Sequence, residues 1–90
     1  MPSTNFDRAL GQFLAELRER SGLSQEALGA AVRRDQSVVS KIESGARRVA
    51  VADLLAWLQA LGIELADIVT DLQSVDPGPQ ATSLWDAGDA

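Results

Sequence analysis

The stretch SQEALGAAVRRDQSVVSKIESG occupies residues 24–45 and reads as two short helices joined by a tight turn. Ser24 is a favoured N-cap residue ahead of an apolar helical pattern. Asp35 is a second N-cap residue, so the first helix is expected to end near residues 32–33. The second helix is expected over residues 36–44. The pattern therefore predicts a helix-turn-helix.

The second helix of this motif is predicted to have one aliphatic and one polar face. Its polar face is either simply solvated or built for recognition, and its place in a helix-turn-helix favours recognition. The second helix of that motif enters the DNA major groove, where Gln pairs with adenine and Ser or Lys meets base edges or phosphate. The candidates for reading bases are Gln36, Ser37, Ser40 and Lys41.

Basic residues lie at both ends of the second helix, where the phosphates of a duplex would run. Such contacts position a protein on DNA without reading its sequence. The candidates for binding phosphate at these ends are Arg33, Arg34, Ser44, Arg47 and Arg48.

Three segments, LRERSGLSQEALG, VVSKIESGARRV and LLAWLQALGIELADIV, carry a resemblance to the lambda-repressor-like (Cro/Xre) helix-turn-helix family over about residues 7–70. The resemblance implies that Gln25 contacts phosphate, that Gln36 and Ser37 read bases, and that Lys41 makes a further contact. It also implies an ion pair between Arg18 and Glu43.

The chain departs from the family pattern in the turn, where Gly and a small apolar residue are usual and Arg33 and Arg34 stand instead. A non-glycine residue with positive φ costs roughly 1 kcal/mol or more. The turn is therefore open to reshaping, which would change the docking angle on DNA and leave the expected fold unchanged.

The charge of the chain is unevenly distributed along its length. The net charge is −5, yet residues 1–48 hold all eight basic residues against six acidic ones, a net of +2. Residues 49–90 hold no basic residue and seven acidic ones, a net of −7. This asymmetry suits one pole that faces phosphate, although an acidic tail without a partner gives the same numbers.

The composition removes several classes of function. The 90 residues include no Cys and no His, which excludes disulfides, thiolate and imidazole catalysis and the usual zinc sites. We therefore expect no enzyme activity, metal or cofactor. The most apolar window, residues 49–63, is interrupted by Asp53 and Gln59, so no membrane segment is predicted and a cytoplasmic location is expected.

The rest of the chain indicates an all-α domain of five helices. The first helix carries apolar residues at helical spacing up to Leu17. The segment 51–61 is too apolar for a one-sided helix, so it is expected to be largely buried or partly a dimer surface. Residues 65–72 fit a helix better than a strand, because Asp67 breaks the strand alternation.

The chain is expected to divide into a helix-turn-helix domain over residues 1–72 and a flexible acidic tail over residues 73–90. The tail contains Leu84 and Trp85, an apolar pair of the kind that can anchor a disordered segment to a partner. A disordered tail that merely contains a Trp is the alternative interpretation.

The sequence thus predicts a homodimeric repressor that binds a palindromic operator in double-stranded DNA. The alternative is an antitoxin of the HipB type, which would inhibit a partner toxin and regulate its own operon. Such antitoxins resemble this chain in size, in motif and in a short tail that contains Trp. A neighbouring toxin gene or a co-purifying toxin would favour the second hypothesis.

Overall fold

The computed structural model describes residues 5–75, which form five α-helices and no strand. The helices are α1 (Asn5–Arg20), α2 (Gln25–Val32), α3 (Gln36–Ser44), α4 (Val51–Leu61) and α5 (Leu65–Gln73). The predicted five-helix, all-α class is confirmed, including the helix preferred over a strand after residue 64. None of these helices is both long enough and apolar enough to cross a bilayer.

The helix-turn-helix forms over the predicted residues. Ser24 caps α2, since its hydroxyl accepts a hydrogen bond from the backbone N–H of Ala27 at 3.0 Å. Asp35 takes the N-cap position of α3 with an extended backbone, but its side chain makes no capping hydrogen bond. Sequence reasoning was therefore right about where α3 begins and wrong about what the Asp35 carboxylate does there.

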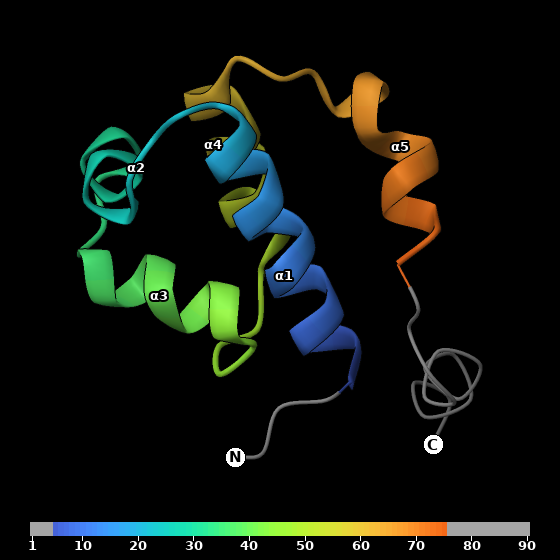
Figure 1. Ribbon diagram of the computed structural model, residues 1–90, viewed down its shortest axis with the longest axis horizontal. Coiled ribbons are helices and arrows are strands. Elements are labelled where there is room, and N and C mark those ends of the chain that lie inside the picture. The colour runs from blue at the N-terminus through green and yellow to red at the C-terminus, as the bar shows by residue number, and fades with distance from the viewer. Residues whose placement is uncertain (1–4, 76–90) are drawn as a thin grey trace.

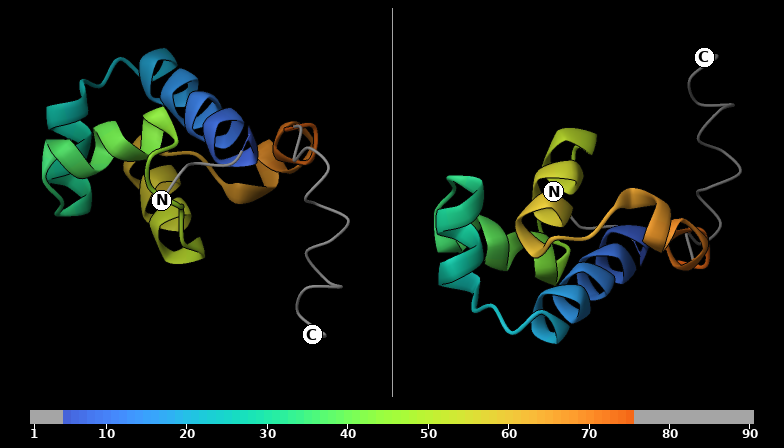
Figure 2. Two further views of the ribbon diagram at one scale, coloured as in Figure 1. Left: turned by 90° about the horizontal axis from the view of Figure 1, so that it is seen from below. Right: turned by 90° about the horizontal axis from the view of Figure 1, so that it is seen from above.

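The helices are arranged with α2 and α3 at one end of the domain and α5 at the other (Figures 1 and 2). Between them lie α1 and α4, which supply most of the core. Trp57 of α4 is buried, and its indole N–H donates to the backbone carbonyl of Leu14 in α1 at 3.3 Å. The buried apolar residues are Leu10, Leu14, Leu17, Leu28, Val39, Ile42, Trp57, Leu58 and Ile68.

The apolar helix α4 divides into a buried and an exposed side. Trp57 and Leu58 are each 2% exposed, whereas Leu55 is 47% exposed. On α5, Leu65 and Val69 are also exposed. The expectation of a largely buried helix thus holds for one side of α4 only, and the other side leaves apolar surface uncovered.

The C-terminal turn of α3 lies directly against the backbone of α1, because a glycine stands at each contact. A Cβ at Gly11 would lie 2.7 Å from the carbonyl oxygen of Glu43 and still closer to that of Ile42. A Cβ at Gly45, where φ is +81°, would lie 2.7 Å from the Cα of Arg8. These approaches fix the end of α3 on α1.

Candidate nucleic-acid interface

The helix α3 presents a continuous polar face to solvent. Its aliphatic side is turned inward, with Val39 and Ile42 buried and Val38 half-buried. The predicted division of this helix into two faces is therefore present in the structure. The exposed polar residues of α3 are Gln36, Ser37, Ser40, Lys41 and Ser44.

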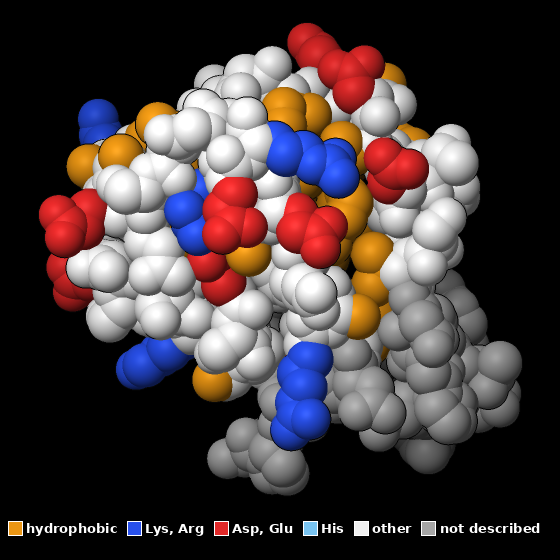
Figure 3. All heavy atoms as spheres, in the orientation of Figure 1, with side chains coloured by type: hydrophobic (Ala, Val, Ile, Leu, Met, Phe, Trp, Pro, Cys, Tyr) orange, Lys and Arg blue, Asp and Glu red, His pale blue; other side chains and the backbone are white. Residues whose placement is uncertain are grey.

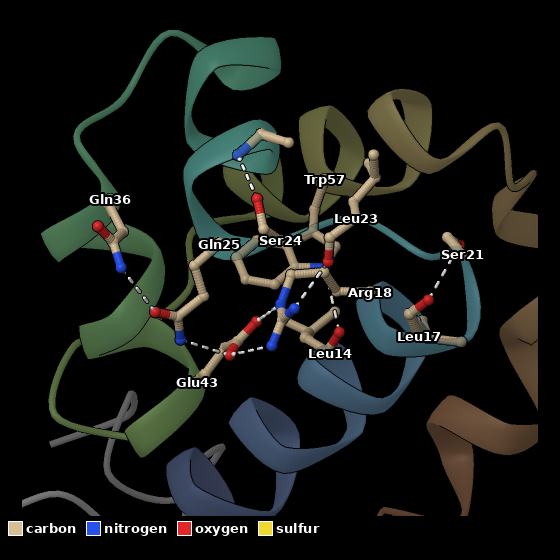
Figure 4. Close-up of polar contacts among 11 residues, drawn as sticks. Leu14, Leu17, Arg18, Ser21, Leu23, Ser24, Gln25, Gln36, Glu43 and Trp57 are labelled. Atoms are coloured by element: carbon tan, nitrogen blue, oxygen red, sulfur yellow. Dashed lines mark hydrogen bonds and ion pairs between the residues drawn. The ribbon is translucent and has the colours of Figure 1, made fainter.

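An ion pair ties α3 to α1 beneath this face (Figure 4). Arg18 Nε donates to Glu43 Oε2 at 2.6 Å, and Nη2 donates to Oε1 at 3.2 Å. The third guanidinium nitrogen, Nη1, donates to the carbonyl of Leu23 at 2.7 Å. Both side chains are largely covered, at 12% and 8% exposed. Arg18 therefore joins α1 to α3 and to the loop before α2.

The electrostatics of this pair favour the charged form of Arg18. The hydrogen bond to Glu43 raises the pKa of the guanidinium, and this effect outweighs the lowering caused by burial. A bidentate pair of this kind is both strong and directional. Loss of one partner would leave the other charge buried, which typically costs about 3 to 5 kcal/mol.

Two glutamines extend this linkage to the start of α3. Gln25 Nε2 donates to Glu43 Oε1 at 2.8 Å, and Gln36 Nε2 donates to Gln25 Oε1 at 3.3 Å. Figure 4 shows the resulting line of contacts from Arg18 to Gln36. The side-chain amide of Gln25, expected to contact phosphate, thus holds Gln36 on one side and Glu43 on the other. Gln36 itself stays exposed.

The four arginines that flank α3 are all exposed, but they differ in their partners. Arg34 lies 3.6 Å from Asp53 of α4, and Arg48 lies 4.0 Å from Asp7 of α1. Arg33 and Arg47 have no carboxylate partner within residues 5–75. On the face seen in Figure 3, acidic and uncharged atoms separate the basic side chains from one another.

Arg33 occupies the turn in a left-handed conformation, with φ 59° and ψ 45°. Among the described residues it is the one non-glycine residue with positive φ. Its backbone N–H donates to the carbonyl of Ala30, and that of Arg34 donates to Gly29, so the turn closes as a helix C-cap. The turn keeps the shape expected of a glycine even though arginine stands there.

The remaining predicted contacts lie at the far end of α3. The Ser44 hydroxyl donates to the Lys41 carbonyl at 3.1 Å and accepts from the Ala46 N–H at 3.4 Å. Its oxygen helps to cap α3. The Lys41 side chain is exposed on the polar face.

Three residues of this region escaped sequence reasoning. Gly11 had a signal, because glycine inside a helix is unfavourable and often marks a close backbone approach. No sequence signal pointed to Asp7 or Asp53, since each approaches its arginine only because separate segments of the chain pack together. Within residues 5–75, no group of three or more Asp, Glu, His or Cys side chains could hold a metal ion.

Comparisons of the chain with known proteins agree with the helix-turn-helix geometry described above. A family model described as a helix-turn-helix domain matches residues 9–69. The chain belongs to this helix-turn-helix family. An XRE-family like protein from Pseudomonas syringae is 30% identical, with a TM-score of 0.68, over 81% of this chain and 88% of that one. The resemblance to Cro/Xre proteins is thus confirmed.

Two further relatives are control proteins. Control protein C.MunI from Mycoplasma sp is 36% identical over 64 residues, which cover 70% of this chain and 86% of the relative. The restriction-modification controller protein C.AhdI from Aeromonas hydrophila is 39% identical, with a TM-score of 0.63. That match covers 68% of this chain and 92% of C.AhdI.

Proposed function

We propose that this protein is a sequence-specific DNA-binding transcription regulator that reads the major groove with α3. The observation that carries the proposal is the exposed polar face of α3, which lies above the largely covered ion pair of Arg18 and Glu43. Gln36 stands at the N-terminal end of that face and is linked through Gln25 to Glu43. An exposed side chain with one hydrogen bond to its own domain is suited to pairing with a base edge, because that bond orients the amide and leaves its other N–H and its oxygen to the base.

Base reading is assigned to Gln36, Ser37, Ser40 and Lys41, which share the exposed face. Phosphate binding is assigned to the residues that surround this face. The exposed Arg33 and Arg47 are the most available of these. The other phosphate candidates are Gln25, Arg34, Ser44 and Arg48.

We propose that the protein acts as a homodimer and that the second copy covers the exposed apolar residues of α4 and α5. Leu55 and Leu65 line the same groove at the connection between these helices. Val51 lies one turn before Leu55, and Val69 lies one turn after Leu65. A two-fold axis at this surface would place one α3 on each side of it. A dimer of this kind matches a palindromic operator with half-sites one helical turn, about 34 Å, apart.

The dimer surface can be tested with a charge. Leu55→Glu or Leu65→Glu would bury a carboxylate between two copies, so sedimentation should show a monomer and operator binding should weaken. Gln12→Glu adds the same charge to the exposed side of α1 and should leave the dimer intact. A dimer that survives both leucine substitutions would place the interface elsewhere.

We further propose that the protein represses transcription by occupying a promoter in the cytoplasm. The names of C.MunI and C.AhdI as control proteins support a regulatory role. Selection of bound sites from a pool of random duplexes tests the sequence-specific binding on which this repression depends. We expect one enriched palindromic sequence, whereas equal recovery of all sequences would contradict it.

A toxin partner is a separate hypothesis, and nothing in residues 5–75 favours it. It depends on Leu84 and Trp85, which lie outside the described residues, as does nearly all of the expected tail. Purification of the native protein from its source would test it. Recovery of a stoichiometric partner that Trp85→Ala releases would support the antitoxin hypothesis.

A further inference from the structure

Two of the four arginines that flank α3 are paired with a carboxylate of the same chain. We propose that Asp53 and Asp7 hold Arg34 and Arg48 in the free protein and release them to DNA phosphates on binding. This inference rests on the proposed function, since it concerns the arginines assigned to phosphate. It makes the two aspartates determinants of DNA affinity, although neither would touch DNA.

The two pairs are loose. Arg34 Nη2 lies 3.6 Å from Asp53 Oδ1, and Arg48 Nε lies 4.0 Å from Asp7 Oδ2. Both distances exceed those of a good hydrogen bond, whereas Arg18 approaches Glu43 to 2.6 Å. A pair held only by charge at such distances exchanges its partner at small cost.

Burial indicates which partner would leave. Asp53 and Asp7 are mostly covered, at 20% and 13% exposed, and each stands in the first turn of its helix, where the helix dipole favours an anion. Arg34 and Arg48 are 52% and 75% exposed. The carboxylates are therefore the fixed partners, and the guanidinium groups are the ones free to turn toward a phosphate.

The two pairs lie at opposite ends of α3. Arg34 stands beside Arg33 in the turn before the helix, and Arg48 stands beside Arg47 in the segment after it. Within the part of the chain that the structure describes, each end thus offers one arginine without a carboxylate partner and one whose charge is already balanced. The aspartates reduce the positive charge available to any duplex, so they should lower the sequence-independent part of binding.

Asp53→Asn tests the exchange. We expect binding to a random-sequence duplex at low salt to tighten by about two- to fivefold per subunit, the range that an exposed ion pair corresponds to. The gain should shrink as salt rises, and the salt slope should steepen by up to about one unit per subunit. Asp71→Asn, on α5 at the other end of the domain, removes the same charge and should leave affinity nearly unchanged.

A double-mutant cycle with Arg34→Ala decides the mechanism. If Asp53 acts by holding Arg34, the gain from Asp53→Asn disappears in the Arg34→Ala background. A gain that persists there would show simple repulsion between Asp53 and DNA and would overturn the proposal. An unchanged affinity for Arg34→Ala alone would also overturn the proposal. Selection of bound sites from random duplexes would test the proposed function separately. Asp7→Asn with Arg48→Ala repeats the cycle at the other end of α3.

Discussion

The side chains at the two ends of α3 are held to very different degrees. At the C-terminal end, Ile42 is buried, Glu43 is bound by Arg18, and Gly11 brings the backbone of α1 against the helix. At the N-terminal end, the side chains of Gln36 and Ser37 are exposed, and one 3.3 Å hydrogen bond to Gln25 holds the Gln36 side chain. The difference fits the proposed function, in which the C-terminal end of the helix stabilises the domain and the N-terminal end reads DNA.

Substitution of Glu43 should produce the largest effect, because it removes the anchor of the held end. Glu43→Ala leaves Arg18 buried without its partner, which should cost about 3 to 5 kcal/mol of unfolding free energy. For a domain of this size, the melting temperature should fall by more than about 10 °C. Thermal unfolding followed by circular dichroism measures this fall in melting temperature.

Glu16→Ala is the matched control, since Glu16 is exposed on the same helix as Arg18. It should melt close to the parent. If Glu43→Ala behaved like Glu16→Ala, the ion pair would contribute no more than a surface contact and the contrast between the two ends would be lost.

Gly11→Ala tests the backbone contact. Helix propensity alone would make this change stabilising by about 1 kcal/mol. The added methyl group would instead meet the Ile42 and Glu43 carbonyls, so we expect a loss of about 1 to 3 kcal/mol. Chemical denaturation of the variant beside Gln12→Ala, an exposed neighbour in α1, separates the two effects. A more stable Gly11→Ala protein would show that α1 and α3 are not in close contact.

Arg33→Gly should have a smaller effect of opposite sign. Glycine adopts the left-handed conformation of residue 33 without strain, so stability should rise by about 0.5 to 1 kcal/mol. Affinity for DNA of any sequence should fall, because a positive charge beside α3 is lost. Paired denaturation and binding measurements would reveal both changes, and a destabilised variant would contradict the turn conformation.

The sequence predicted the helix-turn-helix well, because its signals are local. Ser24 and Asp35 are N-cap residues, and the aliphatic pattern of residues 36–44 shows which face of α3 is buried. Each of these features depends on a residue and its neighbours within one or two turns. The family resemblance added the pairing of Arg18 with Glu43, which spans 25 residues and has no local signal.

The parts that escaped prediction depend on packing between helices. Asp53 lies 19 positions beyond Arg34 in the chain, and Asp7 lies 41 positions before Arg48, so nothing in the sequence connects either pair. The role of the Gln25 side chain as a bridge from Glu43 to Gln36 also depends on how α2 packs against α3. Contacts of this kind follow from the fold and cannot be read from periodicity.

The most direct test of the central claim, that the lightly held end of α3 reads DNA, is Gln36→Ala measured on two duplexes. On the preferred operator the variant should lose about 1 to 3 kcal/mol of binding free energy per subunit, and on a random duplex it should lose little. Its unfolding free energy should stay within about 0.5 kcal/mol of the parent, since Gln36 is exposed. Equal losses on both duplexes would contradict the assignment of base reading to this end of α3.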